Sequence, residues 1–330
     1  MSSKRNRKDS QINRRKFLVK ASTTLGLATV VGVWGVAFYD DKAIRRSKEK
    51  IYTFQDFRIE EKTLFPQMVI VHGRAEHTML KGAIENMGGI SRFVQKGDRV
   101  LIKPNVGWDR QPEQAANTNP LLVGAMVKLC KEAGASEVWV TDVPVNQAER
   151  CFSRSGIKKA VEEEQGKIKW VGDQDFVETD LGGSVLKNWP VCRFFHEVDK
   201  LINMPIVKHH SLSKGTLSMK NWYGVLGGKR NQLHQNIHES IVDLASAIQP
   251  TLTVMDATRV LKRNGPTGGN LEDVSIENTI VVGTDQVAVD AYSLKFLDLS
   301  LEDIPNIIRA GEKKVGTSDW RSLNMTEFTV

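Results

Sequence analysis

KLINMPIVKHHSLSKGTLSMKNWYGVLGGKR, which spans Lys200–Arg230, is the stretch that decides how this chain folds. It opens with an apolar run over residues 201–207, a pattern typical of a buried strand in an α/β sheet. Lys208, His209 and His210 follow this run directly. Ligands of open α/β sheets bind beyond the carboxyl ends of the strands, so this order predicts a site where the strand ends.

The second half of this central stretch carries more polar side chains. Lys220-Asn221-Trp222-Tyr223-Gly224 comes after a turn that contains Ser and Gly, and Gly227-Gly228-Lys229-Arg230 follows. Cations, imidazoles and an amide that gather behind one strand indicate a site for an anionic or metal-bound ligand. A solvated basic loop is the alternative. Trp222 and Tyr223 argue against it, because large aromatic side chains are seldom fully exposed.

Outward from the central stretch, short apolar runs alternate with helical patterns. The alternation predicts an α/β fold with a mainly parallel sheet covered by helices, and residues 173–193 add a small hairpin or flap insertion. Asn119 with Pro120 marks the start of one helix, and Asp285 caps another that runs through Leu297. The expected strands are residues 68–72, 98–102, 137–142, 167–171, 252–256 and 279–283, and further helices are expected at 120–131 and 237–245.

Several of these strands deliver residues that suit a site. Pro104 cannot donate a ladder hydrogen bond, so Lys103 and Asn105 are expected at the end of their strand. Parallel strands emit their loops at one edge, which predicts one cavity for Lys103 and the central stretch. Burial lowers the pKa of a lysine toward that of a general base, and histidine is the other proton carrier. The predicted catalytic residues are Lys208, His210 and Lys220, and the predicted ligand-binding residues are Lys103, Asn105, Asn221, Asp256, Gly265 and Gly268.

Residues 262–270, KRNGPTGGN, are rich in glycine and begin with two cations, and we name this segment the glycine loop. It follows the strand that Asp256 is expected to end. Backbone N–H groups in such a loop can cradle a phosphate, and Gly265 and Gly268 are the residues that a cradle would use. The loop matches neither the P-loop nor the dinucleotide pattern. A plain turn is the other interpretation, and the sequence leaves both open.

A histidine pair gives a second hypothesis. His234 and His238 are four residues apart, and on one helix this spacing places both imidazoles on the same face, as metal sites require. The pair is not in an HExxH frame, and His234 falls near the expected helix start. One capping and one solvated histidine is therefore the alternative. A divalent metal would need a third ligand from His209, His210, Asp142 or Asp256.

The order of these pieces resembles the DUF 362 family, a domain of unknown function. The likeness runs from about Val69 to Gly316. It implies an α/β domain with a site but no particular reaction, and it favours a buried Asp290 with a partner such as a site lysine. The matching pieces are the strand followed by Lys208-x-His210, Lys220-Asn221 ahead of a glycine, Lys103-Pro104-Asn105, Asp256, Gly265-Pro266 with Gly268, and Asp285 through Asp290.

Charge and cysteine content exclude two classes of function. The chain has a formal charge of +7, but residues 1–50 hold thirteen Lys and Arg against four Asp and Glu, which leaves 33 against 35 for residues 51–330. A nucleic-acid binder needs the excess on its folded domain, so nucleic acid is not expected as a partner. The three cysteines form no CxxC pair, so the iron–sulfur module that some members of the resembled family carry is not expected either.

Residues 1–38 have the pattern of an export leader. Basic residues surround Asn13-Arg14-Arg15-Lys16-Phe17-Leu18, which resembles the twin-arginine motif, and residues 21–39 are uncharged but only mildly apolar. A stable membrane span needs about 20 predominantly apolar residues, so a signal is favoured over an N-terminal anchor. The expected partner is the twin-arginine translocase during export. The body is expected to be periplasmic or extracytoplasmic, tethered to the inner membrane only if the leader is uncleaved.

The rest of the chain divides into a charged linker, residues 39–66, and a DUF 362-like α/β domain, residues 67–330. Three functions are compatible with this organisation. The first, which the sequence favours, is a protein that binds or acts on a small anionic ligand in a cleft lined by Lys, His and Asn. The second is a divalent-metal-binding protein. The third is a non-catalytic accessory or assembly factor for periplasmic redox enzymes, suggested by the export pattern and the iron–sulfur members of the resembled family. No substrate or cofactor follows from the sequence.

Overall fold

The computed structural model describes residues 50–61 and 63–330, and contacts within the chain separate residues 51–330 from residues 1–50. The predicted leader and the first part of the predicted linker therefore lie outside the described residues. The later part of that linker packs on the body. The Phe57 side chain is buried in the core, and the Tyr52 backbone N–H donates to the Glu178 carbonyl. This corrects the expectation that the body starts near Pro66.

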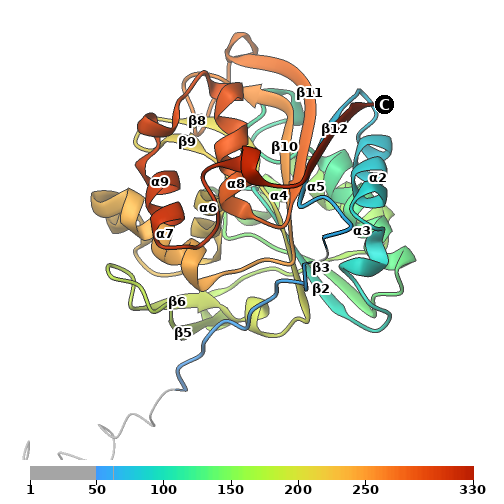
Figure 1. The fold of residues 1–330 in the computed structure, drawn as a ribbon. Helices are drawn as coiled ribbons and strands as arrows, with labels where there is room; N and C mark the ends of the chain where they lie inside the picture. The colour runs from blue at the N-terminus through green and yellow to red at the C-terminus, as the bar shows by residue number, and fades with distance from the viewer. Residues whose placement is uncertain (1–49, 62) are drawn as a thin grey trace, which may run out of the picture. The chain divides into compact units, whose positions relative to one another are not determined.

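Residues 51–330 form an α/β fold around a mainly parallel, mixed sheet, which confirms the predicted fold class (Figure 1). The strands of the main path follow the spatial order β12-β1-β11-β10-β7-β2-β3-β4. Neighbours are parallel except where β11 pairs with β1 and with β10. These strands are β1 Met68–His72, β2 Arg99–Pro104, β3 Glu137–Val140, β4 Lys167–Ile168, β7 Lys200–Met204, β10 Leu252–Leu261, β11 Val274–Gly283 and β12 Met325–Thr329.

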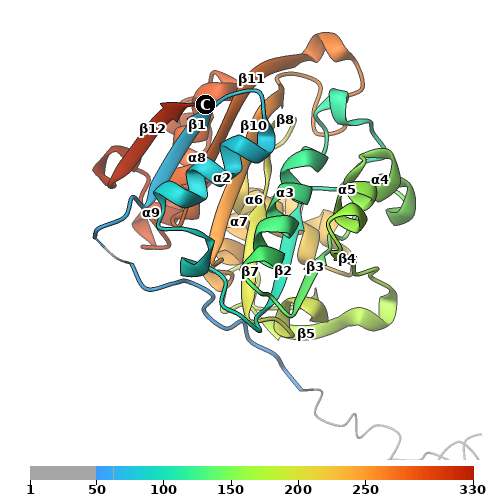
Figure 2. The same cartoon turned by 90° about the vertical axis from the view of Figure 1, so that its right-hand side faces the viewer.

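Helices cover both faces of the sheet because successive strand residues point to opposite sides. In β1, Met68 and Ile70 belong to one apolar cluster, whereas Val69 and Val71 belong to the other. Figures 1 and 2 show α2, α3 and α5 over one face and α6, α7, α8 and α9 over the other. The helices are α2 Glu76–Asn86, α3 Pro120–Glu132, α4 Ala148–Arg154, α5 Ile157–Glu163, α6 Ser218–Asn221, α7 Ile237–Ala247, α8 Gln286–Ser293 and α9 Pro305–Glu312.

The apolar run of the central stretch is two strands, not one. Pro205 lies between β7 and β8 (Ile206–His210), and β8 leaves the main path to pair with β10 and with β9 (Lys214–Thr216). Proline has no N–H to donate to a ladder, so pairing changes partners there. Lys208 and His210 therefore lie within a strand, which corrects the expectation of a loop after the strand end.

Several further elements differ from their predicted bounds. β10 and β11 continue past the expected ends and pair antiparallel, with an irregularity between Ala257 and Arg259, so Asp256 lies inside a strand. The strand expected at 167–171 is reduced to Lys167–Ile168, and β12 was not predicted. The remaining insertion is as predicted, since β5 (Phe176–Asp180) and β6 (Asn188–Cys192) form an antiparallel two-stranded sheet.

Two predicted helix starts are confirmed. The Asn119 side chain accepts a hydrogen bond from the Leu121 N–H ahead of α3, and the Asp285 carboxylate accepts from the N–H groups of Val287 and Ala288 ahead of α8. These caps satisfy backbone donors that the first helical turn leaves open. Across residues 50–61 and 63–330, none of the helices combines the length and the apolar character that crossing a membrane demands.

Candidate functional site

A cavity of about 300 Å³ lies at the sheet edge where β2 and β3 end and where β8 continues beyond β7. This volume is at the lower end of the range found for ligand pockets and suits a small molecule. The convergence predicted for Lys103, Lys208, His210 and Lys220 is confirmed, since all four side chains line this cavity. The predicted residues that line it are Lys103, Asn105, Lys208, His210, Lys220 and Asn221.

Lys103 forms a buried ion pair at the base of the cavity. Its Nζ lies 2.8 Å from Asp142 Oδ1 and donates to Asn221 Oδ1 and to the Pro104 carbonyl, each at 2.9 Å. Burial lowers the pKa of Lys103, and the Asp142 charge opposes that shift. A Cβ atom on Gly224 would overlap Asp142 Oδ1 and would lie 2.5 Å from Lys103 Nζ, so only glycine leaves room for the pair.

Lys208 is held by neutral oxygens. Its Nζ donates to Asn105 Oδ1 at 2.9 Å and to the Ala116 carbonyl at 2.5 Å. Asn105 in turn donates through Nδ2 to Asn221 Oδ1, which links the two lysine sites through amides. Burial, followed by the charge of Lys220, lowers the pKa of Lys208 well below its ordinary value.

Lys220 and Arg230 add two cations that have no carboxylate partner within residues 50–61 and 63–330. The Lys220 amine has no hydrogen-bond acceptor among these residues and lies 5.1 Å from the centre of the Tyr223 ring. The Arg230 guanidinium donates only to the carbonyls of Tyr223 and Pro144. Burial, followed by the charges of Arg230 and Lys103, lowers the pKa of Lys220 to about 7.

The His210 ring is a hydrogen-bond donor to the cavity and not a base. Its Nδ1 accepts from the N–H groups of Leu212 and Ser213 at 3.1 and 3.3 Å, so the proton of the neutral ring is on Nε2. Burial, followed by the charges of Lys220 and Lys208, lowers the pKa of His210 to about 2. The geometry therefore argues against the predicted proton-carrier role, because the lone pair of the neutral ring is already engaged by two backbone N–H groups.

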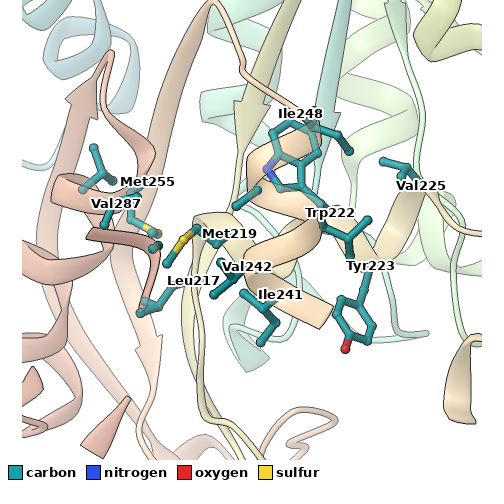
Figure 3. Packing of buried hydrophobic residues seen from close by; sticks show 14 of the residues in the cluster. Leu217, Met219, Trp222, Tyr223, Val225, Ile241, Val242, Ile248, Met255 and Val287 are labelled. Carbon is teal, nitrogen blue, oxygen red and sulfur yellow. The ribbon is translucent and has the colours of Figure 1, made fainter. Parts of the chain in front are cut away.

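Residues 217–230 carry Lys220, and we name them the lysine segment. Apolar packing and hydrogen bonds to Asp290 hold this segment in place. Figure 3 shows Met219 directed toward Met255, with Trp222 beside Ile248 and Tyr223 pointing away from Trp222. The Asp290 carboxylate accepts from the backbone N–H groups of Ser218 and Met219 at 2.7 and 3.1 Å. Asp290 is buried as expected, but it holds the start of α6 and does not pair with a lysine.

Three predicted ligand-binding residues do not line the cavity. Asp256 is buried and accepts from the Asn119 and Thr258 N–H groups, so it joins β10 to the start of α3. A Cβ on Gly265 would overlap the His209 carbonyl, and one on Gly268 would lie 2.8 Å from Leu261. These glycines allow the glycine loop to pack closely on β8 and β10, and of this loop only Pro266 lines the cavity.

The predicted metal pair is not supported. α7 begins at Ile237, so His234 lies on the preceding turn Arg230–Asn236 instead of sharing a helical face with His238. His238 Nδ1 is hydrogen-bonded with Asn306 Oδ1, and only His234 lines the cavity. In the described part of the chain, no group of three or more His, Cys, Asp or Glu side chains is placed to hold a metal ion.

Sequence reasoning did not assign several cavity residues the roles that the structure gives them. Arg230 stands in the central stretch, but nothing in GGKR shows that its guanidinium turns inward. Asp142 was recognised as a strand-end acid, and its pairing with Lys103 depends on β2 and β3 being neighbours. Thr216 also lines the cavity, its hydroxyl is buried without a hydrogen-bond partner in the described part of the chain, and no sequence pattern indicates this.

Comparisons with known proteins give a family match, a similar protein and a similar structure. The family model described as "Domain of unknown function (DUF362)" matches residues 100–295, which hold the cavity residues named above. The thylakoid-associated protein sll1697 of Synechocystis sp. (strain ATCC 27184 / PCC 6803 / Kazusa) is 26% identical over 252 residues, which are 72% of this chain and 74% of that protein. The lactate racemase apoprotein from Thermoanaerobacterium thermosaccharolyticum matches with a TM-score of 0.42 and 16% identity, over 78% of this chain and 62% of that chain.

Proposed function

The chain belongs to the DUF362 family, whose description assigns no reaction, and from this premise we propose that its cavity binds a small organic anion. One observation carries the proposal. Four basic side chains, Lys103, Lys208, Lys220 and Arg230, line the cavity against a single carboxylate among the described residues, Asp142. An anion that enters would supply the missing negative charge in a site where little solvent screens it.

Two polar groups support a ligand over a merely structural charge cluster. The Lys220 amine makes no hydrogen bond within residues 50–61 and 63–330, and the buried Thr216 hydroxyl has no partner there. Buried polar groups without partners are rare, because each one costs free energy unless something satisfies it. A carboxylate or phosphate that enters the cavity would give the Lys220 amine an acceptor.

The test is the effect of anions on thermal unfolding. Glutarate and inorganic phosphate are expected to raise the melting temperature of the wild-type protein, because a ligand of the folded state alone stabilises it. The rise is expected to be smaller for Lys220→Met and to shrink as sodium chloride is added. Lys214→Met is the matched control, since the Lys214 amine is exposed and paired with Asp303. Equal shifts for wild type and Lys220→Met, or none for either, would overturn the proposal.

Export through the twin-arginine route is a separate proposal, supported by the sequence of residues 13–20. The translocase distinguishes an arginine pair from other cations. Changing Arg14 and Arg15 together to Lys is therefore expected to leave the precursor in the cytoplasm, as cell fractionation would show. Unimpaired export of that double variant would exclude the route.

A further inference from the structure

The three lysines of the cavity differ in what their amines contact. Lys103 Nζ has three oxygen partners and Lys208 Nζ has two, so both amines are engaged by protein atoms. The Lys220 amine has none in the described part of the chain, although its side chain is almost fully buried and lines the cavity. Of the three, Lys220 alone has a nitrogen lone pair that is free for a bond to a ligand.

The surroundings of Lys220 favour the neutral amine. Arg230 and Lys103 carry positive charge in the same cavity, and no carboxylate faces the Lys220 amine among residues 50–61 and 63–330. Burial and these two cations lower the pKa of Lys220 to about 7. A desolvated lysine beside other cations is a known form of activated nucleophile, because a large fraction of it is unprotonated at neutral pH.

We propose that Lys220 is a nucleophile that forms a Schiff base with the carbonyl carbon of an oxo acid, whose carboxylate is held by Arg230. The inference rests on the proposed function, since it specifies the class of anion. Arg230 uses N–H groups on two carbonyls, and a guanidinium has five, so donors remain for a carboxylate. A simple carboxylate would satisfy Arg230 but would leave the Lys220 lone pair unused.

The chemistry balances without a further reactant. The Lys220 amine attacks the carbonyl carbon, and the carbonyl π electrons move to oxygen. One amine hydrogen transfers to that oxygen to give a carbinolamine. The hydroxyl takes up the proton that the ammonium form released, leaves as water, and the nitrogen lone pair forms the C=N bond. The sum is one lysine ammonium and one carbonyl converted to one iminium ion and one water.

Two other residues that line the cavity carry hydrogen-bond donors suited to the carbonyl oxygen that leaves as water. Thr216 lines the cavity, and its buried hydroxyl has no hydrogen-bond partner in the described residues. The His210 ring carries its proton on Nε2, because both contacts of Nδ1 are donated to it by backbone N–H groups. Each group is able to donate a hydrogen bond to the carbonyl oxygen of a bound oxo acid, and donors placed there stabilise the charge that develops on that oxygen.

The experiment is reductive trapping on the intact protein. Wild-type protein is incubated with pyruvate or with 2-oxoglutarate at pH 7.5, treated with sodium borohydride, and analysed by intact mass and peptide mapping. One adduct is expected, on the peptide that contains Lys220. Lys220→Arg keeps the charge but removes the nucleophilic amine, and it is expected to abolish the adduct. Lys214→Arg, at an exposed and ion-paired lysine, is expected to be trapped like wild type.

Glutarate separates the failure of this inference from the failure of anion binding, because it matches 2-oxoglutarate except for the carbonyl. Thermal stabilisation of wild type by glutarate without an adduct from either oxo acid overturns the Schiff base and leaves anion binding intact. Adducts spread over surface lysines, or equally strong in urea-unfolded protein, also overturn it. Neither stabilisation nor an adduct rejects both proposals. If Lys220→Arg does not fold, the position of the adduct in wild type decides.

Discussion

The lysine segment (residues 217–230) and the glycine loop (residues 262–270) have similar compositions and opposite roles. Each is basic and contains three glycines. In the glycine loop, the Lys262 amine lies near Glu277 and Asp298, and Arg263 lies near Asp273. In the lysine segment, Lys220 and Arg230 have no acidic partner within residues 50–61 and 63–330. Basic charge marks a candidate site only where it is buried and left uncompensated.

The glycines of the two segments teach the same lesson. Gly224 leaves space for the pair of Lys103 and Asp142, and Gly265 lets its loop meet the β8 backbone. At both positions the glycine is needed because a Cβ atom would collide with a neighbouring group. Neither glycine serves to bind phosphate through its N–H group. Glycine content alone therefore does not separate a phosphate cradle from close packing.

The largest effect is expected from Gly224→Ala. The added Cβ would displace the Asp142 carboxylate from Lys103, and breaking a buried ion pair costs about 3–5 kcal/mol of unfolding free energy. Gly107→Ala is the matched control, since its nearest neighbour would be Asn105 Oδ1 at 4.0 Å. Urea unfolding of both variants measures the difference. A Gly224→Ala variant as stable as Gly107→Ala would show that the pair does not fix this wall of the cavity.

The next largest effect is expected from replacing the buried aspartate that contacts each segment, Asp290 for the lysine segment and Asp273 for the glycine loop. Asp290→Ala leaves the buried N–H groups of Ser218 and Met219 without an acceptor, at about 1–3 kcal/mol for each. Because α6 carries Lys220, the variant is also expected to lose its response to glutarate. Asp273→Ala frees Arg263 and Asn264, which reach solvent more readily. It is expected to be milder and to keep the ligand response, and a full response in Asp290→Ala would argue against the role of α6.

The sequence predicted the fold class and the convergence of the lysines because both follow from local patterns and one topological rule. Apolar runs that alternate with capped helices indicated the α/β sheet, and parallel strands brought Lys103 and Lys208 to one edge. The change of partner between β7 and β8 at Pro205 was not predicted. Strand pairing depends on residues that are distant in sequence, such as those of β10. For the same reason Asp256 was expected at a strand end and lies within β10.

The roles within the site were harder to predict than its members. The N–H groups that occupy His210 Nδ1 come from Leu212 and Ser213, two and three residues along the chain, but residue type alone does not show that the backbone turns to make these contacts. The spacing of His234 and His238 indicated one helical face, but the helix begins only at Ile237. Side-chain orientation and hydrogen-bond occupancy depend on the exact path of the backbone, so residue type and spacing alone assign them poorly.

An affinity comparison is expected to show a smaller effect. Arg230→Gln removes a buried cation from the cavity and is expected to weaken glutarate binding by about tenfold, or about 1.4 kcal/mol. Arg263→Gln removes an exposed cation of the glycine loop and is expected to leave the affinity unchanged. Isothermal titration calorimetry measures both. Equal losses would mean that the overall charge, and not the cavity, attracts the anion.

The last effect is expected in the pH dependence of ligand-free stability. The Lys220 amine keeps its proton to about pH 7 in the folded state and, at its ordinary pKa of 10.5, to higher pH in the unfolded chain. Between these values the unfolded state binds more protons, so the unfolding free energy that Lys220 contributes rises with pH.

Lys220→Met has no amine to titrate in this pH range. It is expected to melt at or above the wild-type temperature near pH 6.5, with the difference shrinking toward pH 10. Differential scanning calorimetry in buffers free of phosphate and carboxylates would decide. A Lys220→Met difference that is constant with pH would show that Lys220 is charged in both states, which would remove the physical basis for contrasting its segment with the glycine loop.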